Sequence, residues 1–261
     1  MGEPFTFNVR IHNAAYSALG LDYTFVCFGV EDPAAAVPAI RALGIRGMNV
    51  SMPHKIAVIP FLDELDVSAR AIGAVNTIDN RAGKLTGYNT DCIGAVRALE
   101  EVTPLRGLRL ALLGAGGAAR AIAYGVREAR ASVTIFNRTS ERARKLAADL
   151  ELRYGGALGD FDAGAFDIVV NATAAGFRAP DISPLEGRLA SHLIVMDAAF
   201  LPVNTKLVRD AKALGCKTIN GTRMMLHQAG KQVELYTEMP APIEAMESAL
   251  MQEIAHMEQT G

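Results

Sequence analysis

The sequence predicts an α/β protein in which a split first domain encloses a second domain built on a parallel sheet. Three observations support this prediction. Strand-like and helix-like segments alternate through the middle of the chain, a glycine-rich loop joins one such pair, and the C-terminal segment is helical throughout. Such alternation is typical of a parallel sheet covered on both faces. We expect one domain at residues 93–221 and a second, split domain at residues 1–92 and 222–261.

The composition is that of a globular protein with a substantial core. The chain has 261 residues, of which 50% are hydrophobic and 21% charged, with a net charge of −2. The absence of a basic excess argues against a nucleic-acid partner, and the longest wholly apolar run, residues 110–119, is too short to cross a membrane. Three scattered cysteines, no clustered metal ligands and no secretory leader predict a metal-free cytoplasmic protein. We expect a monomer or a homodimer.

The first third of the chain mixes short strands with helices. Residues 21–30 are rich in Tyr, Phe and Val and predict a strand. Residues 32–43, with Pro33 near the start and Gly44 after the end, predict a capped helix. A short strand is expected at residues 47–50, and a hairpin is expected from residues 74–78 and 84–88 around a turn at residues 79–83.

The middle of the chain alternates regularly. Strands are predicted at residues 108–113, 132–136, 167–170, 193–196 and 217–219, and helices at residues 118–129, 141–150 and 205–213. After Gly221 the pattern is helical again. One apolar stripe steps by three and four through Ile243, Met246, Leu250, Ile254 and Met257. We expect this tail to complete the first domain.

A glycine-rich loop, Gly-Ala-Gly-Gly-Ala-Ala at residues 114–119, lies between a predicted strand and a predicted helix. Glycines there permit a tight turn and let backbone N–H groups approach a pyrophosphate, whose charge suits a helix N-terminus. The strand–loop–helix–strand setting predicts a Rossmann-type dinucleotide-binding domain, with Gly114, Gly116, Gly117 and Ala118 at the cofactor. A loop that serves only close packing is the alternative.

The end of the next predicted strand distinguishes between nicotinamide cofactors. A site for NAD carries Asp or Glu about 20 residues after the glycine loop. Here the strand is followed by Asn137, Arg138 and Thr139, and then by Arg142. Arginine binds a 2′-phosphate in a bidentate manner, whereas a carboxylate would repel it. These four residues therefore predict NADP, although a solvated helix N-terminus is an alternative. A methyltransferase is another class of protein with such a glycine loop, but it would need an acidic residue at this strand end to bind a ribose, and Asn137 and Arg138 fit that poorly.

Three polar segments of the first domain carry groups suited to chemistry. Residues 49–55 (Asn-Val-Ser-Met-Pro-His-Lys) end in Lys55, residues 74–77 place Asn76 among apolar neighbours, and residues 87–91 end in Asp91. A Lys–Asp pair near a nicotinamide can exchange a proton with an alcohol or ketone during hydride transfer. Each residue alone could equally be an ordinary surface residue.

Together with the glycine loop, these segments resemble the shikimate dehydrogenase family over nearly the whole chain. The family patterns are N-V-[TS]-x-P-x-K, A-V-N-T, N-T-D, a glycine loop followed by N-R-T, N-A-T, and a closing M-x-x-x-Q. They stand in this order at residues 49–55, 74–77, 89–91, 114–119 with 137–139, 171–173, and 224–228. Six modest motifs in one order make a specific signal.

The resemblance implies an activity. Members of the family reduce 3-dehydroshikimate to shikimate with NADPH, in a cleft between two domains and as a step of aromatic amino acid biosynthesis. By this likeness Lys55 would pass a proton to or from the reacting oxygen, and Asp91 would hold Lys55 and a substrate hydroxyl.

The resemblance also implies further site residues. The ring hydroxyls of the substrate would be bound by Ser51, Asn76 and Gln228, with Asn49 beside them. Thr173 and Gly221 would lie at the cofactor.

The segment expected to bind the substrate carboxylate departs from the family pattern. Where the family usually carries S-x-S-P before I-H-N, this chain has Thr6-Phe7-Asn8-Val9 before Arg10-Ile11-His12-Asn13. Thr6 and Asn8 can still donate hydrogen bonds to a carboxylate, and Arg10 is either a further carboxylate partner or a solvated helix residue. A second departure is Phe200, where the family commonly has a Tyr that touches the substrate. In these two departures the chain resembles the shikimate dehydrogenase-like paralogues, whose substrates often differ.

Two other functions stay open on the sequence alone. The first keeps the chemistry and changes the substrate to quinate, an amino-shikimate or another hydroxylated ring acid. The second is a ligand-binding regulator that kept the fold without catalysis. Lys55, Asp91 and Asn76 argue against the regulator, because a binding protein has no need of a proton-transfer pair.

Overall fold

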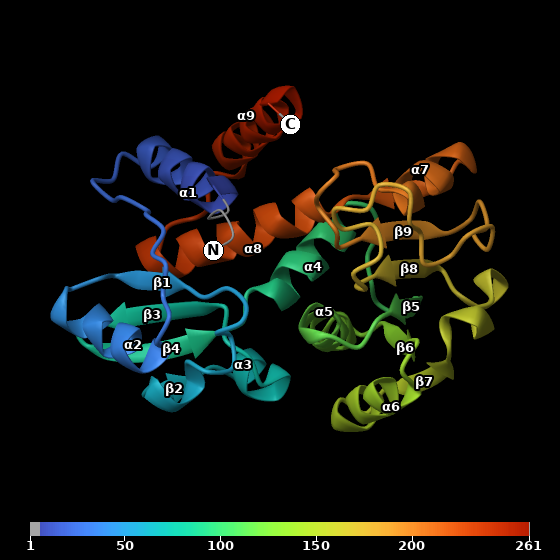
Figure 1. Cartoon of the computed structure of the whole chain (residues 1–261), viewed down its shortest axis with the longest axis horizontal. Helices are drawn as coiled ribbons and strands as arrows, with labels where there is room; N and C mark the ends of the chain where they lie inside the picture. Colours follow the sequence, from blue (N-terminus) through green and yellow to red (C-terminus); the bar gives the residue numbers. More distant parts are fainter. Residues whose placement is uncertain (1–5, 261) are drawn as a thin grey trace. The chain divides into compact units, whose positions relative to one another are not determined.

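The computed structural model describes residues 6–260, and side chains over residues 7–257. The chain folds into two compact units, drawn in Figure 1. The first unit runs to Thr90 and resumes at Leu226, and the second unit comprises Asp91–Met225. Each unit has its own sheet and its own core, and each is described separately below.

The second unit is built on a six-stranded sheet with the strand order β10-β9-β8-β5-β6-β7, in which all neighbouring strands are parallel. The chain begins in the middle of the sheet, moves outward through β6 and β7, and returns to the other side of β5. Parallel sheets of this kind bind ligands beyond the carboxyl ends of their strands, at the point where the order reverses. That point lies between β5 and β8. The strands are β5 (Arg109–Leu113), β6 (Ser132–Phe136), β7 (Arg153–Gly156), β8 (Ile168–Asn171), β9 (Ile194–Asp197) and β10 (Lys217–Ile219).

The helices of the second unit pack on this sheet and on one another. They are α4 (Asp91–Glu100), α5 (Gly117–Glu128), α6 (Ser140–Asp149) and α7 (Lys206–Ala213), with short 3-10 turns at Leu158–Asp160 and Ala163–Ala165. Helix α4 packs against α5, α6 against β6 and β7, and α7 against β9 and β10. The approach of α4 to α5 needs a glycine, because a Cβ on Gly125 would lie 2.7 Å from the Cys92 carbonyl oxygen.

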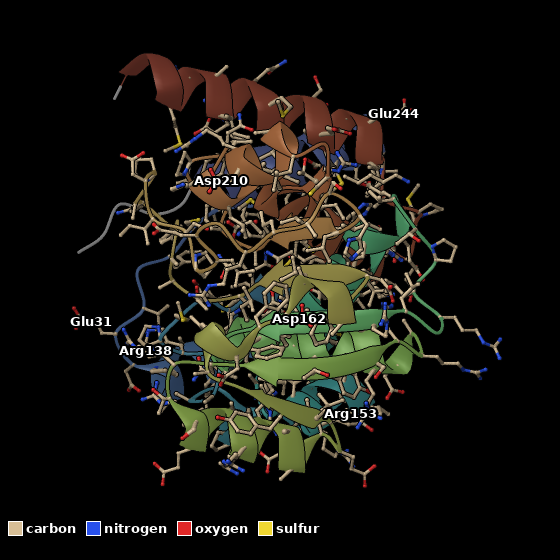
Figure 2. The ribbon with its side chains drawn as sticks, turned by 90° about the vertical axis from the view of Figure 1, so that its right-hand side faces the viewer. Glu31, Arg138, Arg153, Asp162, Asp210 and Glu244 are labelled. Carbon is tan, nitrogen blue, oxygen red and sulfur yellow. The ribbon has the colours of Figure 1, made fainter. Side chains whose placement is uncertain are left out.

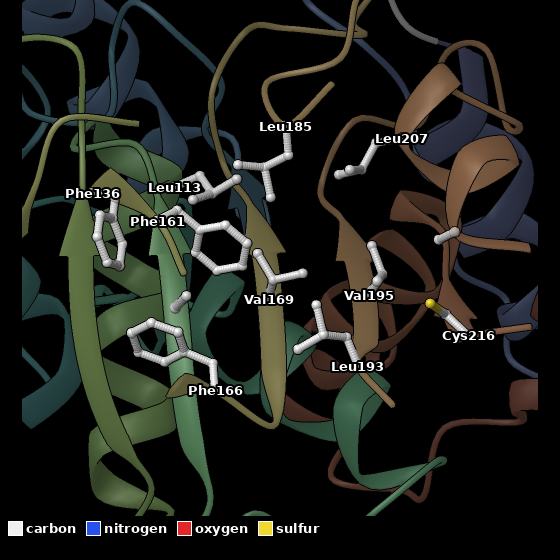
Figure 3. Packing of buried hydrophobic residues seen from close by; sticks show 12 residues of the cluster. Leu113, Phe136, Phe161, Phe166, Val169, Leu185, Leu193, Val195, Leu207 and Cys216 are labelled. Atoms are coloured by element: carbon white, nitrogen blue, oxygen red, sulfur yellow. The ribbon is translucent and has the colours of Figure 1, made fainter. Parts of the chain in front are cut away.

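Large apolar side chains fill one face of this sheet (Figure 3). Three aromatic rings are its bulkiest members. The ring of Phe136 stands edge-on to Phe161 and to Phe166, with centroids 5.9 and 5.7 Å away. Phe161 and Phe166 stack on each other with centroids 5.8 Å apart, and aromatic rings prefer edge-to-face or offset-stacked contacts to a perfect face-to-face arrangement. Short aliphatic residues from β8 and β9, among them Val169 and Val195, complete the layer.

The first unit has a four-stranded mixed sheet with the order β1-β3-β4-β2. Its strands are β1 (Gly47–Asn49), β2 (Glu64–Leu65), β3 (Thr77–Arg81) and β4 (Lys84–Tyr88). The predicted hairpin is present, but β3 begins later than expected and the turn shrinks to Ala82 and Gly83. Both have positive φ angles, 51° and 89°, as a two-residue hairpin turn requires.

Helices close the first unit around this sheet. They are α1 (Thr6–Ala18), α2 (Pro33–Ala42), α3 (Val67–Ile72), α8 (Gly221–Thr237), which starts in the second unit, and α9 (Ile243–Thr260), with a 3-10 turn at Ile59–Phe61. Helix α9 packs against α1, and its predicted apolar stripe is buried at Met246, Leu250 and Ile254. Met257, the last residue of the stripe, is 38% exposed.

The strand predicted at residues 21–30 is wrong. These residues have no regular secondary structure, and the described part of the chain supplies no strand that pairs with them. A strand needs a neighbour for its backbone hydrogen bonds, so composition alone could not decide this segment. It is held instead at two points. The Asn13 side chain bonds both backbone groups of Phe25, and a nitrogen of His54 lies 3.0 Å from the Val30 carbonyl oxygen.

His12, on α1, is fully buried in the first unit. Its ring stacks on Phe25 at 4.3 Å, and Nδ1 lies 2.8 Å from the Asn8 carbonyl oxygen, so that nitrogen carries a proton. Burial lowers the pKa of His12 from its usual 6.5 to about 4, against smaller opposing effects of hydrogen bonds. His12 is therefore neutral at physiological pH and serves the fold.

We expect acidification to destabilise the protein through His12. In the unfolded chain the imidazole gains a proton near pH 6.5, whereas the folded protein resists protonation until about pH 4. Stability is therefore highest above pH 6.5 and falls as the pH drops toward 4, by roughly 3 kcal/mol at 1.36 kcal/mol for each unit of pKa. Thermal unfolding between pH 7 and pH 4.5 measures this loss.

The variant His12→Gln removes the titrating group, and His192→Gln is the control because it leaves His12 intact. We expect a weaker pH dependence in the first variant alone. An equal fall in melting temperature for both variants and the unchanged protein would contradict the assignment.

Candidate functional site

The glycine loop of the second unit makes a close backbone contact at the carboxyl edge of its sheet. Gly114 follows β5 with a φ of 115°, and its N–H donates to the Phe136 carbonyl oxygen at 2.8 Å. A Cβ on Gly114 would lie 2.8 Å from the Ala172 carbonyl oxygen, in the loop after β8. Both the dihedral angle and the contact exclude any other residue. The loop therefore sits at the reversal point between β5 and β8.

The rest of the loop is open to solvent. Gly116, Gly117 and Ala118 are exposed, and the first helical turn of α5 starts with no side chain capping it. The backbone N–H groups of a helix start are left without helical partners and attract anions. A cradle of this shape, with space where side chains would otherwise stand, fits the pyrophosphate of a dinucleotide.

The predicted phosphate-binding residues follow β6 at the same edge. Arg138, Thr139 and Arg142 are exposed, while the Asn137 side chain donates to the Thr139 carbonyl oxygen at 2.9 Å and shapes the turn. Figure 2 shows Arg138 and Arg153 toward opposite ends of the strands, since Arg138 follows β6 and Arg153 begins β7. The exposed guanidinium groups of Arg138 and Arg142 suit the additional 2′-phosphate of NADP.

A buried polar cluster joins the loops after β8 and β9. Asn171 ends β8 and Asp197 ends β9, and both are fully buried. The Asn171 amide donates to the Asp197 carboxylate at 2.9 Å, and the Thr205 hydroxyl donates to it at 2.6 Å. Burial raises the pKa of the Asp197 carboxyl, while its hydrogen bonds from Thr205, Ala199 and Asn171 act against that rise.

Thr173, a predicted cofactor residue, is held by this cluster. Its N–H and hydroxyl both donate to the Asn171 side-chain oxygen, at 3.0 and 2.7 Å, and its hydroxyl accepts from the Ala175 N–H. The Thr173 hydroxyl thus shapes its own loop.

Gly221, at the start of α8, lies against the loop after β9. A Cβ there would lie 2.6 Å from the Ala198 carbonyl oxygen. The predicted cofactor residue Gly221 therefore adjoins the same edge of the sheet as Gly114. Phe200, on that loop, packs on Phe177 with ring centroids 5.4 Å apart.

In the first unit, Lys55 lies in the turn that follows β1. Its carbonyl oxygen accepts from the Val75 N–H at 2.8 Å, which ties this turn to the segment that carries Asn76. The Lys55 side chain is half-buried and Ser51 is exposed. His54, between them, points to Val30.

Asn76 is buried beside the end of the first unit. Its side-chain oxygen accepts from the Thr90 N–H at 2.8 Å and from the Thr77 hydroxyl at 2.8 Å, and its amide donates to the Thr90 hydroxyl. These bonds fix the segment that immediately precedes Asp91. Asp91 is the first residue of α4 in the second unit, where a carboxylate is favoured by the helix dipole, and it is 7% exposed.

A chain of hydrogen bonds missed by sequence analysis continues from Thr77 to α8. Gln232 donates to the Thr77 hydroxyl and accepts from the Asn49 amide, and the Tyr236 hydroxyl donates to the Asn49 oxygen at 2.6 Å. Burial raises the pKa of Tyr236 well above its usual value. Both ends of the Asn49 side chain are thereby bound within the protein. Only the fold brings α8 to β1, so no local signal could have found these partners.

The residues proposed for the substrate carboxylate lie on α1. The Asn8 side-chain oxygen is buried without a hydrogen-bond partner, and the side chain of Thr6 lies outside the described residues. Arg10, whose side chain is 65% exposed, forms an ion pair with Glu253 of α9 at 3.2 Å and so links α1 to α9. Gln228 is half-buried on α8.

No group of three His, Cys, Asp or Glu side chains within residues 7–257 is placed to hold a metal ion. No helix in the described part of the chain is long and apolar enough to cross a membrane.

The fold and the glycine loop at the reversal point of a parallel sheet define a dinucleotide-binding protein. Family models match in three parts. The shikimate dehydrogenase substrate-binding domain matches residues 5–78, the shikimate/quinate 5-dehydrogenase domain residues 97–182, and the shikimate 5′-dehydrogenase C-terminal domain residues 221–251. A shikimate dehydrogenase (NADP(+)) of Methanothermobacter thermautotrophicus is 41% identical, covering 96% of this chain and 94% of the relative. The chain belongs to the shikimate dehydrogenase family.

Solved structures agree on the fold. A shikimate dehydrogenase in complex with NADP+ superposes with a TM-score of 0.90 at 38% identity, covering 95% of this chain and 91% of that one. The shikimate 5-dehydrogenase of Thermus thermophilus in complex with NADP(H) and shikimate has a TM-score of 0.86 and 34% sequence identity. The match covers 95% of this chain and 94% of that one. A 5-ketofructose reductase of Gluconobacter gives 0.86 at 36%, covering 94% and 93%. A quinate dehydrogenase of Corynebacterium glutamicum in complex with NAD gives 0.86 at 30%, covering 97% and 96%.

The two arginines after β6 predict which cofactor is preferred. Replacing Arg138 or Arg142 by Ala removes a charge-assisted bond to a 2′-phosphate, so we expect the KM for NADP to rise roughly tenfold or more and the KM for NAD to stay unchanged. Steady-state kinetics with each cofactor measure the difference.

Arg144→Ala is the matched control on the same helix. Its guanidinium lies over the Tyr154 ring, 4.4 Å from the centroid, so we expect no change in the KM for NADP. If all three variants weaken NADP and NAD alike, Arg138 and Arg142 do not read the 2′-phosphate.

Proposed function

We propose that this protein is an NADP-dependent dehydrogenase that interconverts 3-dehydroshikimate and shikimate. The observation that carries the proposal is the glycine cradle at the β5–β8 reversal point with Arg138 and Arg142 beside it. The motifs around Lys55, Asn76 and Asp91 support it, as does 41% identity to a named enzyme of this activity. When bound, NADPH supplies the hydride that reduces the ketone.

Lys55 is the proposed proton donor to the ketone oxygen as the hydride arrives at its carbon, and it takes the proton back in the oxidation. The lysine side chain can do both, because its ammonium form donates a proton and the neutral amine that remains accepts one. The turn that holds it is fixed at its backbone by Val75. Asp91 orients the reaction by accepting a hydrogen bond from a substrate hydroxyl. Ser51, Asn76 and Gln228 bind the remaining ring hydroxyls.

Thr6 and Asn8 are the proposed partners of the substrate carboxylate. The Asn8 amide offers donors at the position where family members usually carry serine. Gly114, Gly116, Gly117, Ala118 and Gly221 form the cofactor cradle, Asn137 and Thr139 shape its phosphate end, and Thr173 places the loop opposite.

A second candidate keeps the chemistry and changes the substrate to quinate or another hydroxylated ring acid. The altered carboxylate segment favours it, because Asn8 replaces a small hydroxyl with a longer amide. The fold accommodates such changes, since a quinate dehydrogenase and a 5-ketofructose reductase are among the similar structures.

Replacing both Lys55 and Asp91 by Ala tests the catalytic assignment. We expect turnover with shikimate to fall by roughly a hundredfold or more, because positioned proton transfer contributes at least that much. NADP binding, measured by calorimetry, should persist. The control pair Lys84→Ala and Glu64→Ala removes a similar charge pair from an exposed site and should retain activity. Residual turnover near that of the unchanged protein would refute the roles of Lys55 and Asp91.

A further inference from the structure

The carboxylate of Asp197 is buried without a cationic partner in the second unit. Asp197 is 0% exposed, and the described ion pairs of the unit do not include it. Its partners are three neutral donors: the Asn171 amide at 2.9 Å, the Thr205 hydroxyl at 2.6 Å and the Ala199 N–H at 3.0 Å. Burying a carboxylate is costly unless it is well hydrogen-bonded, and such a group calls for an explanation.

The three donors come from separate parts of the chain. Asn171 ends β8, Ala199 lies in the loop after β9, and Thr205 caps the N-terminus of α7, where its hydroxyl also accepts from the Val208 N–H. Gly176, with a φ of 90°, lies close enough that a Cβ there would be 3.5 Å from the carboxylate. One side chain thus fixes the loop at residues 172–176 relative to the loop at residues 198–205.

Those two loops carry the backbone contacts that form the cradle. The loop after β8 supplies the Ala172 carbonyl oxygen that faces Gly114, and the loop after β9 supplies the Ala198 carbonyl oxygen that faces Gly221. Further bonds between the loops run from Ala198 N–H to Asn171 O at 2.9 Å and from Arg178 N–H to Leu201 O at 2.7 Å. A shift of either loop would therefore disturb both the contact at Gly114 and the contact at Gly221.

We propose that Asp197, through Asn171 and Thr205, is the positioning residue that holds the loops after β8 and β9 in the shape that binds the cofactor. This inference rests on the proposed NADP-dependent activity. Asp197 touches no reacting atom in this scheme. Its carboxylate accepts three hydrogen bonds whose directions set the course of both loops.

The isosteric change Thr205→Val removes one donor and the helix cap without changing the volume, and Thr205→Ser restores both. We expect Thr205→Val to raise the Kd and the KM for NADP about tenfold, the loss expected when a hydrogen bond to a buried charge is removed. The KM for shikimate should stay within about twofold, and Thr205→Ser should return the cofactor constants to those of the unchanged protein. The variant Asp197→Asn should act in the same direction. Because the chain has no tryptophan, binding is measured by calorimetry.

The control is Asp167→Asn, at the amino end of β8 in the same sheet. Asp167 is bound by the Arg109 side chain and N–H, on the edge away from the cradle. We expect a lower melting temperature and unchanged constants for NADP. If Thr205→Val also changes only the melting temperature, or if it raises the KM for NADP and the KM for shikimate by the same factor, Asp197 is merely structural and the proposal falls. If Asp197→Asn does not fold, the Thr205 pair decides.

Failure of the proposed function has a different signature. If the unchanged protein binds NADP and does not oxidise shikimate, the calorimetric Kd still tests Asp197. If the unchanged protein does not bind NADP, the proposed function and this inference both fail.

Discussion

The contact between Gly114 and the Ala172 carbonyl oxygen is the constraint on which the second unit depends. It forces a left-handed backbone conformation after β5 and excludes any side chain there. It also fixes the distance between the loops that follow two neighbouring parallel strands. Once these strand ends are so close, the helix N-terminus of α5 and the loop after β8 face the same space. An anion-binding cradle follows from that geometry.

Buried polar side chains near the strand ends form hydrogen bonds with one another. In the second unit the Asn171, Asp197 and Thr205 side chains satisfy one another and shape the loops. In the first unit the side chains of Asn49, Gln232 and Thr77 form a comparable chain that leads to Asn76. Apart from the half-buried Asn49, the members of both clusters are buried and hydrogen-bonded to one another, so each cluster specifies one arrangement of its neighbours. In each unit, buried hydrogen bonds thereby fix the loops and strand ends that carry the candidate site residues.

Local sequence patterns predicted much of the fold and part of the candidate site. The glycine loop, the exposed arginines after β6 and most strands of the parallel sheet follow from short-range sequence rules. The segment at residues 21–30 failed because strand propensity says nothing about whether a neighbour exists. The N-A-T motif indicated Asn171 and Thr173, but not Asp197 or Thr205. Those partners lie far away in sequence and meet only when β8 and β9 pair. Gln232 and Tyr236 were missed for the same reason.

The most direct measurement of the central claim is the initial rate at which the purified protein forms NADPH from NADP or NADH from NAD. Shikimate and quinate are compared as substrates, each with NADP and with NAD. We predict steady NADPH formation from shikimate and NADP, with a kcat/KM at least about tenfold above that for quinate or for NAD, the ratio expected when one charged or polar contact is lost. NADP binding without reduction by shikimate, or equal rates with NAD, would contradict this account.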